Sequence, residues 1–495
     1  MKYLIRFFPE MTVKSRSVRQ QQIKQLKKNI RLIVKGLCEE ARIGGCWDLL
    51  EVELPAQLSE EKQQAISDAL ASTPGIHHFM QAQEFELPDR QTLCQRVLES
   101  VGQRLQGKTF AVRVQRAGVH EFTSLDLERE IGAFLLKHAG PSRVQLKEPE
   151  ETVMLQVHHQ RVFIVGARRE GIGGYPLGTQ EQVATLMSGG FDSCVAAYQM
   201  LQRGVCTHFI FFRLGGVAHE QGVKEVAHHL WQRYGSSHRV KFVTVPFEAV
   251  VEQILTQVDN AQMGVVLKRA MLHCADQLAR RLRIGALVTG EAIAQVSSQT
   301  LTNLQVIDRC IDRLVLRPLI TTHKQTIIDQ AFAIGVAEMS ARIPEYCGVI
   351  SQRPTIRARL EEVEAEEAKI DPACLEAAVR GAVIQKIDQV LLAPDLPEFA
   401  SNSAAESTDK RAIVVLDVRA PADVEANPLP AIRYPVECLP FYKLHSEFAQ
   451  LDAEFEYWLY CDQGVMSGLQ VQNLQAAGFQ NLKVLPAAEL TSLRT

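Results

Sequence analysis

Four apolar runs limit most strongly what this chain can fold into, and they lie at 183–187, 207–212, 240–245 and 285–289. Each run has the length of one strand, and segments with helical periodicity separate them. Strands buried on both faces of a parallel sheet have this composition, because crossover helices cover the sheet from both sides. The sequence therefore predicts an α/β domain with a doubly wound parallel sheet, which we place at 181–392.

A glycine-rich turn, Ser188-Gly189-Gly190-Phe191-Asp192-Ser193, joins the first apolar run to a predicted helix that extends to Leu201. Glycine lets the backbone approach an anion closely, serine hydroxyls can donate to it, and a helix N-terminus carries partial positive charge. Asp192 suits Mg²⁺ beside phosphates better than it suits bare phosphate. An ordinary strand-to-helix turn is the alternative, but the whole pattern favours a nucleotide-phosphate site.

A second phosphate-loop pattern is interpreted as a coincidence. The segment from Gly102 to Thr109 fits GxxxxGK[ST] letter for letter. That motif follows a strand and opens a helix. Here a predicted helix at 89–105 comes first and a predicted strand at 109–115 follows, so the sequence predicts a polar turn that ends the helix.

The first third of the chain has the pattern of an α+β region with a basic beginning. Residues 1–50 carry 11 Lys and Arg against 4 Asp and Glu, whereas the whole chain has a net charge of −3. This distribution indicates a polyanion partner confined to one region, with a solvated basic helix at 18–36 as the alternative. The other predicted elements of this region are strands at 2–7, 152–157 and 162–166, two short strands around 46–54, and helices at 17–36, 59–71 and 124–138.

Length and composition limit the location and the chemistry. A chain of 495 residues is long enough for about three or four domains. It has no apolar stretch of the roughly 20 residues that span a bilayer and no signal peptide, so we expect a cytoplasmic protein without a membrane partner. The 11 cysteines form no CxxC pair and no Cys/His cluster, which argues against structural zinc and a disulfide framework.

The acidic stretch at 357–391 is predicted to be helical, and 393–403 is predicted to be a linker.

Several motifs resemble one known family. Ser188–Ser193 resembles the PP-loop of the ATP pyrophosphatases, which cleave ATP between the α and β phosphates to adenylate a substrate. Segments at 290–292, 295–300 and 317–320 and the sequence PEYCG at 344–348 extend the resemblance to the tRNA 4-thiouridine synthetases. The resemblance implies ATP and Mg²⁺, with Asp192 as the metal ligand and Lys324 facing the phosphates. The nucleotide contacts that it implies are Leu186, Met187, Ser188, Gly189, Gly190, Asp192, Ser193, Lys268, Gly290 and Gln299. Without the resemblance, Lys268 is equally well explained as a solvent-facing helix lysine.

The front end resembles the RNA-binding part of the same family. The segment 112–126 is similar to the THUMP domain, which we place at 61–166 after a ferredoxin-like region at 1–60 and before a glycine-rich linker at 167–180. The resemblance implies tRNA as a partner, selected by its shape. Phosphate contacts position RNA without reading its sequence. The candidates for such contacts are Arg113, Arg116, Lys137, Arg143, Lys147, Arg168 and Arg169, although any one of them is more often an ordinary surface charge.

Cys461 stands out among the cysteines by its context. It follows a predicted strand and precedes a predicted helix at 468–477, and N–H groups at a helix start favour a thiolate or persulfide. The motif Cys461-Asp-Gln-Gly-Val-Met-Ser and the segment 415–419 resemble the rhodanese domain, which we place at 404–495. Met466 stands where many rhodaneses have arginine, which leaves less positive charge in the loop and puts thiosulfate chemistry in doubt. Cys347 lies in the Pro/Gly-flanked loop PEYCG, and we expect both sulfurs to be accessible; the other nine cysteines are predicted to be structural.

The resemblance also implies a reaction. A persulfide on Cys461 attacks the adenylated C4 of a uridine, Cys347 resolves the intermediate, and a Cys347–Cys461 disulfide remains for an external thiol reductant. A cysteine desulfurase would supply the sulfur. One rival is a small-molecule ligating PP-loop enzyme, against which the basic front end argues. Another is a sulfur-carrier role, in which the tail delivers sulfur, with a carrier protein of that pathway as a possible partner, for the thiazole of thiamine.

Overall fold

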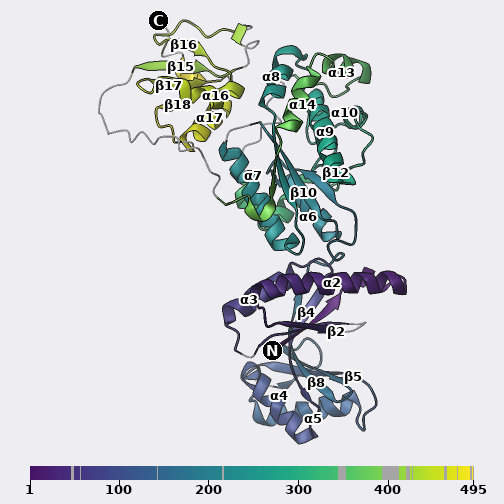
Figure 1. Ribbon diagram of the computed structural model, residues 1–495. Coiled ribbons are helices and arrows are strands. Elements are labelled where there is room, and N and C mark those ends of the chain that lie inside the picture. Colours follow the sequence, from purple (N-terminus) through teal and green to yellow (C-terminus); the bar gives the residue numbers. More distant parts are fainter. Residues whose placement is uncertain are drawn as a thin grey trace. The chain divides into compact units, whose positions relative to one another are not determined.

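The computed structural model describes residues 1–45, 49–55, 57–141, 143–214, 217–343, 353–392, 412–419, 424–425, 427–461, 465–476, 478–490 and 493. The chain divides into two compact units (Figure 1). The first comprises Met1–Thr179 with Gln202–Gly204, and the second comprises Gln180–Leu201 with Val205–Thr495. No helix in the described part of the chain is long and apolar enough to cross a bilayer.

The first unit is built on one eight-stranded sheet with the order β2-β3-β1-β4-β8-β7-β5-β6. Its strands are β1 (Lys2–Phe7), β2 (Arg42–Gly45), β3 (Leu50–Glu53), β4 (Ile76–Glu86), β5 (Thr109–Ala117), β6 (Arg143–Val144), β7 (Glu151–His158) and β8 (Arg161–Glu170). Its helices are α1 (Pro9–Thr12), α2 (Arg16–Leu37), α3 (Glu60–Ala71), α4 (Arg90–Leu105) and α5 (Ser124–His138). The helix-then-strand order predicted around 102–109 is confirmed, because α4 ends at Leu105 and β5 begins at Thr109.

Two hydrophobic cores share this sheet. One core packs α2 and α3 against alternate residues of β1 and β4, such as Ile5 and Phe79. The other packs α4 and α5 against β5, β7 and β8, with Val114 and Leu155 among its members. Because strand side chains alternate between faces, Leu4, Met80 and, on β8, Phe163 and Val165 point to the opposite face.

The second unit contains a six-stranded sheet with the order β13-β12-β9-β10-β11-β14. The strands are β9 (Val183–Leu186), β10 (Thr207–Arg213), β11 (Lys241–Pro246), β12 (Ala286–Val288), β13 (Val315–Leu316) and β14 (Val383–Lys386). The helical segments are α6 (Phe191–Gln202), α7 (Val217–Leu230), the π-helix η1 (Trp231–Gly235), α8 (Glu248–Gln257), α9 (Met263–Leu282), η2 (Ser297–Gln299), α10 (Leu301–Asp308), α11 (Lys324–Ala333), α12 (Ala337–Ala341), α13 (Leu360–Glu367), α14 (Pro372–Arg380) and η3 (Ile387–Gln389).

This sheet confirms the predicted doubly wound arrangement over its first five strands. β9 to β13 are all parallel, and β9 has β10 on one side and β12 on the other. Helices cover both faces: Ile210 packs into the core formed with α8 and α9, whereas the ring of Phe211 contacts His219 of α7. Strand order therefore reverses between β9 and β12, and the carboxyl ends at such a reversal form a binding crevice.

The prediction for 357–391 is wrong in part. Helices α13 and α14 occupy it as far as Arg380, but Val383–Lys386 forms β14, which pairs antiparallel with β11. The sheet is therefore mixed at this edge. Val383 and Ile384 are exposed, as the side chains of an edge strand often are, so no burial pattern marked this segment as a strand.

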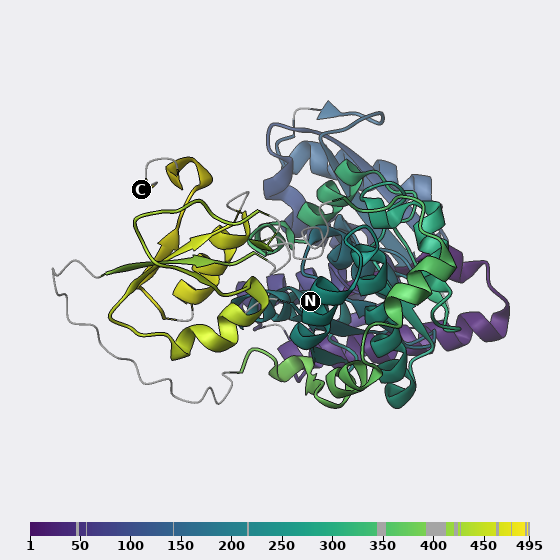
Figure 2. The same ribbon diagram turned by 90° about the horizontal axis from the view of Figure 1, so that it is seen from above.

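The tail has a separate four-stranded parallel sheet with the order β16-β15-β17-β18 (Figure 2). It comprises β15 (Ile413–Asp417), β16 (Val436–Cys438), α16 (Phe441–Glu447), the 3₁₀ turn η4 (Phe448–Gln450), β17 (Glu456–Tyr460), α17 (Val465–Ala476), β18 (Leu482–Val484) and α18 (Ala487–Leu490). Leu444 of α16 and Leu474 of α17 pack on one face, and Leu485 and Leu490 pack on the other. The strand order reverses between β15 and β17, so β17 ends at a second crevice position.

Candidate active site

The turn between β9 and α6 is held by its own hydroxyl groups. Ser188 Oγ and Ser193 Oγ lie 3.2 Å apart, and Ser193 Oγ donates to the carbonyl of Gly190 at 3.0 Å. The backbone N–H of Ser188 donates to Ser193 Oγ at 3.3 Å. The turn therefore presents backbone amides and hydroxyls at the first residues of α6, as the sequence predicts for a phosphate loop.

Two glycines are required by close approaches at this turn. Gly189 has φ +84°, and a Cβ there would lie 2.6 Å from Ile343 Cδ1. Gly290 follows β12, and a Cβ there would lie 2.5 Å from the backbone carbon of Asp192. The end of β12 thus packs directly on the phosphate loop, which only glycine permits.

Asp192 is the acidic centre of this crevice. Its carboxylate accepts from Lys324 Nζ, the first residue of α11, at 2.8 and 2.9 Å. Gln295 Nε2 donates to Asp192 Oδ2 at 2.8 Å. Asp192 and Lys324, both predicted as site residues, are 132 positions apart in the chain and are in contact in the structure. The structure also adds Gln295 as a partner of Asp192.

Lys268 belongs to a second ion-pair network. Its Nζ lies 2.6 Å from Glu291 Oε1, and Glu291 Oε2 accepts from Arg317 Nε at 2.7 Å. Arg317 in turn binds both oxygens of Asp308, at 2.9 and 2.5 Å. The alternative of a solvent-facing lysine is wrong, because only a fifth of the Lys268 side chain is exposed.

The remaining predicted nucleotide contacts border the same crevice. Leu186 ends β9, and Met187 continues the ladder, its N–H donating to the carbonyl of Ile210 at 2.8 Å. Gln299 closes the turn after Gly290: its Oε1 accepts from the N–H of Ala292 at 3.4 Å, and its backbone carbonyl accepts from Ala294 at 3.0 Å. The predicted residues thus sit at the carboxyl ends of β9 and β12 or on the segments that follow them.

Cys461 lies at the equivalent place in the tail, directly after β17. The N–H of Ser467, the third residue of α17, donates to Cys461 Sγ at 3.3 Å, and Ser467 Oγ lies 3.4 Å from the sulfur. The predicted helix start beside the sulfur is confirmed, although α17 begins at Val465 rather than at 468. Such an N–H group stabilises negative charge on sulfur.

The expectation that Cys461 is accessible is wrong. It is 7% exposed and belongs to the hydrophobic core of the tail. Cys347, its predicted partner, lies outside the described residues, as does the loop 462–464. The Cys347–Cys461 disulfide is therefore still a prediction.

The other described cysteines are not all buried. Cys194, next to the phosphate loop, is fully buried, and burial raises its pKa to about 11, so it stays a protonated thiol. Cys438, at the end of the edge strand β16, is exposed, contrary to the expectation of a structural thiol. Burial of part of its side chain, with Asp417 nearby, still raises its pKa.

Comparisons with known proteins extend over nearly the whole chain. The tRNA sulfurtransferase of Azotobacter vinelandii is 49% identical over 486 residues, which cover 98% of this chain and 99% of that protein. The tRNA sulfurtransferase of Shewanella piezotolerans is 46% identical over 485 residues, with the same coverage. The chain belongs to the tRNA sulfurtransferase family.

Two family models locate the likeness within the chain. Residues 178–371 match the family described as Thiamine biosynthesis protein (ThiI), and residues 89–165 match the THUMP domain. A crystal structure of a 4-thiouridine synthetase–RNA complex with bound ATP superposes with a TM-score of 0.69. It covers 78% of this chain and 99% of that chain at 24% sequence identity, so it supports the fold.

The predicted RNA contacts of this family member fall into two groups in the first unit. Arg113, Arg116, Arg143 and Lys147 lie on or beside the edge strand β6 and its neighbour β5, and Lys137 lies on the adjoining helix α5. Arg168 and Arg169 lie on β8 in the middle of the sheet. Several are held by the protein itself: Arg113 donates to the carbonyl of Leu146 at 2.7 Å, and Arg169 to Ser67 Oγ at 2.7 Å and to the carboxylate of Asp68.

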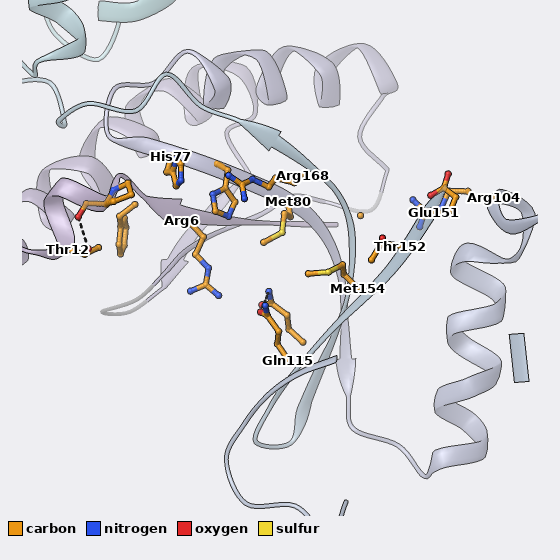
Figure 3. A pocket seen from close by; sticks show the side chains of 15 residues that line it. Arg6, Thr12, His77, Met80, Arg104, Gln115, Glu151, Thr152, Met154 and Arg168 are labelled. Atoms are coloured by element: carbon orange, nitrogen blue, oxygen red, sulfur yellow. Dashed lines mark hydrogen bonds between the residues drawn. The ribbon is translucent and has the colours of Figure 1, made fainter. Parts of the chain in front are cut away.

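Arg168 faces a cavity of about 840 Å³ that the sequence did not indicate (Figure 3). Arg6 and Arg104 also line it, with His77, His78 and the amide of Gln115. Burial, with the positive charge of Arg168, lowers the pKa of His78 to about 4, so that imidazole is neutral at pH 7. Ligand atoms of His77, His78 and Glu170 lie within 4.8 Å of one another, but Arg168 binds Glu170 at 2.7 Å, which disfavours a cation there.

Sequence reasoning missed Glu291, Gln295 and Arg317 as site residues of this tRNA sulfurtransferase. All three lie inside the motifs on which the resemblance to the family is based, but the sequence alone does not show which residues they contact. One signal was available: Glu291 follows an apolar strand by three residues, and side chains after parallel strands gather at one edge of the sheet.

Proposed function

We propose that this protein uses ATP to activate a uridine in tRNA and transfers persulfide sulfur from Cys461 to it, which yields 4-thiouridine. The observation that carries the proposal is the contact of the Ser467 N–H with Cys461 Sγ at a helix start, in a chain that also has a phosphate loop. The names of the relatives, all tRNA sulfurtransferases, support the class of reaction.

In the activation step, the uridine O4 attacks the α-phosphate of ATP and pyrophosphate leaves. The turn 188–193 binds the phosphates through its amides and hydroxyls, and Lys268 and Lys324 supply positive charge. Negative charge builds up on the phosphate oxygens in the transition state, so fixed donors and cations there lower the barrier. Gly290 and Gln299 keep the adjoining segment against the loop.

Asp192 fits the role of a Mg²⁺ ligand. Mg²⁺ in nucleotide sites commonly takes one or two carboxylates, with phosphate oxygens and water completing the shell. Within the described residues Asp192 is the carboxylate at the phosphate loop, and its present partners are a lysine and an amide rather than another acid. The ion would neutralise phosphate charge, and Lys324 and Gln295 would hold the carboxylate in place.

In the sulfur step, the outer sulfur of the Cys461 persulfide attacks C4, and AMP leaves with the former O4. The Cys347 thiolate then attacks Cys461 Sγ and breaks the S–S bond. The outer sulfur remains on C4, and a Cys347–Cys461 disulfide forms, which a thiol reductant opens with two electrons.

The first unit binds the tRNA in this proposal. Arg113, Arg116, Lys137, Arg143, Lys147, Arg168 and Arg169 are the proposed phosphate contacts, and a cysteine desulfurase is the proposed persulfide donor. Within the described residues, the ammonium groups of Lys137 and Lys147 have no acidic partner at salt-bridge distance, so both are available to phosphate. Binding through such contacts weakens steeply as salt concentration rises.

Nucleoside mass spectrometry tests the proposal. Unmodified tRNA is incubated with the protein, ATP, Mg²⁺, cysteine and a cysteine desulfurase, and the digest is searched for 4-thiouridine. We expect 4-thiouridine that depends on ATP and on Cys461. Pyrophosphate release without any thiolated nucleoside would mean that the acceptor is a different molecule.

We propose a second role for the tail, the delivery of sulfur for the thiazole of thiamine to a carrier protein of that pathway. The description of the matching family as a thiamine biosynthesis protein supports it. The full chain with Asp192→Ala should rescue a thiazole auxotroph that lacks the native protein while leaving its tRNA unthiolated. Failure of this variant to rescue, where the parent chain rescues, would remove the second role.

A further inference from the structure

Glu291 occupies an unusual place for a carboxylate. It is 7% exposed and lies directly after Gly290, where a Cβ would come within 2.5 Å of the backbone carbon of Asp192, so that no side chain fits. The backbone of Glu291 is thereby fixed against the phosphate loop.

Three donors surround this carboxylate. Oε1 accepts from Lys268 Nζ at 2.6 Å, and Oε2 accepts from Arg317 Nε at 2.7 Å and from Thr289 Oγ1 at 3.0 Å. Burial alone raises the pKa of Glu291, but Lys268 and Arg317 outweigh it and lower the pKa below its usual value. The group is therefore ionised throughout the neutral range.

The two cations on Glu291 differ in how much freedom they retain. Arg317 is held by two carboxylates, because its Nε binds Glu291 and its two terminal nitrogens bind both oxygens of Asp308. Lys268 Nζ has Glu291 as its one hydrogen-bond acceptor within the described residues, which leaves two N–H groups for a further acceptor. Arg317 thus anchors Glu291, and Glu291 restrains Lys268.

A purely stabilising role explains this arrangement poorly. Burying an ion pair costs about as much desolvation energy as the pair returns, so such pairs add little stability compared with apolar residues. An ion pair can hold an ammonium group in a fixed direction beside a phosphate site, and apolar residues cannot.

We infer that Glu291 is a positioning residue that holds the Lys268 ammonium toward the nucleotide phosphates, with Arg317 as its anchor. The inference rests on the proposed function, in which Lys268 contacts ATP. It adds a series of hydrogen-bonded side chains, from Asp308 through Arg317 and Glu291 to Lys268, which orients the Lys268 ammonium group.

Glu291→Gln tests the inference, because it keeps the shape and removes the charge. ATP-Mg²⁺ binding, measured by equilibrium dialysis at a temperature where the variants are folded, should weaken roughly tenfold, the scale of one charged hydrogen bond. Asp276→Asn is the matched control: Asp276 is also a buried carboxylate of this unit, on the same helix as Lys268, and pairs with Arg313 at 2.6 Å and Arg280 at 2.8 Å. It should lose stability to a similar extent but bind ATP as the parent does.

A double-variant cycle separates positioning from a general structural effect. If Glu291 acts through Lys268, then Lys268→Met with Glu291→Gln should bind ATP as weakly as Lys268→Met alone. Additive losses, unchanged binding by Glu291→Gln, or an equal loss in Asp276→Asn would overturn the inference. Unchanged binding by Lys268→Met would instead overturn the nucleotide contact on which it rests.

A milder variant keeps the test valid if Glu291→Gln does not fold. Asp308 is 43% exposed in its side chain, and Asp308→Asn weakens the anchor without creating a buried unpaired charge. We expect about threefold weaker ATP binding, on the scale of a weak hydrogen bond, and no further loss in the Lys268→Met background. A further loss there would contradict the series from Asp308 to Lys268.

Discussion

The junctions β9–α6 and β17–α17 occupy equivalent places in their two sheets and differ in chemistry. Each follows a strand at the reversal point of a parallel sheet and leads into a helix, α6 or α17. In the first, two serine hydroxyls and glycines form an open turn around backbone amides. In the second, a cysteine sulfur replaces the first hydroxyl and accepts the helix N–H itself.

In both places the N–H groups at the start of the helix favour negative charge, and the residue at the end of the strand decides which group binds to them. Ser188 Oγ accepts only a long hydrogen bond, 3.4 Å, from the N–H of Gly190, and an exchangeable anion such as a phosphate can replace it there. In the proposed function, Cys461 fills the same place with a covalently attached sulfur, which carries the persulfide. Under that proposal, one chain binds an activating nucleotide and carries a sulfur atom with the same local device.

The largest expected effect comes from removing the sulfur of the second turn. Cys461→Ser should abolish 4-thiouridine formation, because no persulfide can form, while tRNA-dependent pyrophosphate release continues at the parent rate. Cys438→Ser is the control, since Cys438 is also in the tail but exposed and remote from the turn in sequence. Multiple-turnover thiolation by Cys461→Ser would show that the second turn carries no sulfur.

The matching change in the first turn should have the complementary effect. Asp192→Asn should slow pyrophosphate release by about 10²-fold, the cost of removing one electrostatic group from a transition state. Loading of Cys461 with persulfide by the desulfurase, followed by mass spectrometry of the intact protein, should be unaffected. Asp329→Asn, an exposed carboxylate on the same helix as Lys324, should change neither quantity. Normal pyrophosphate release by Asp192→Asn would disprove the assignment of this turn.

A methyl group at Gly290 tests how tightly the first turn is packed. Gly290→Ala places a Cβ 2.5 Å from the Asp192 backbone, and overpacking of this kind costs about 1–3 kcal/mol of unfolding free energy. Gly264→Ala on α9 meets no atom within 4 Å and should instead stabilise the protein by about 0.5–1 kcal/mol. Urea unfolding of both variants measures the difference. Equal stabilities would mean that the segment after β12 does not press on the phosphate loop.

The smallest effects come from removing one hydroxyl from each turn. Ser193→Ala and Ser467→Ala each delete a hydrogen bond worth about 0.5–1.5 kcal/mol but leave the helix N–H groups in place. Ser193→Ala should weaken ATP binding several-fold, and Ser467→Ala should slow alkylation of Cys461 by iodoacetamide to a similar degree. If Ser467→Ala weakened ATP binding while Ser193→Ala did not, the two turns would have been assigned the wrong roles.

The strands and the phosphate loop could be predicted from the sequence because their patterns are local. The apolar runs at 183–187 and 207–212 differ from their neighbours in composition, and the turn 188–193 combines glycine, serine and aspartate at one strand end. The strand β14 has no such pattern, since it is short, exposed and identified by its pairing with β11.

The parts of the site that escaped prediction depend on contacts distant in sequence. Glu291 meets Lys268 across 23 residues and Arg317 across 26, and neither distance follows from a motif. Cys461 is buried in a core that also contains Leu416 of β15 and Leu444 of α16, which are distant from it in sequence. Local patterns therefore located both turns, but only tertiary packing showed which side chains support them.

One measurement tests most directly whether a single chain both activates the uridine and donates the sulfur. Cys461 is loaded with ³⁴S persulfide by a desulfurase, the protein is separated from desulfurase and cysteine, and ATP, Mg²⁺ and unmodified tRNA are added for one turnover. We expect ³⁴S to leave the protein and appear in 4-thiouridine only when ATP is present. Retention of ³⁴S on Cys461 while ATP is consumed, or its transfer to tRNA without ATP, would contradict the proposed function.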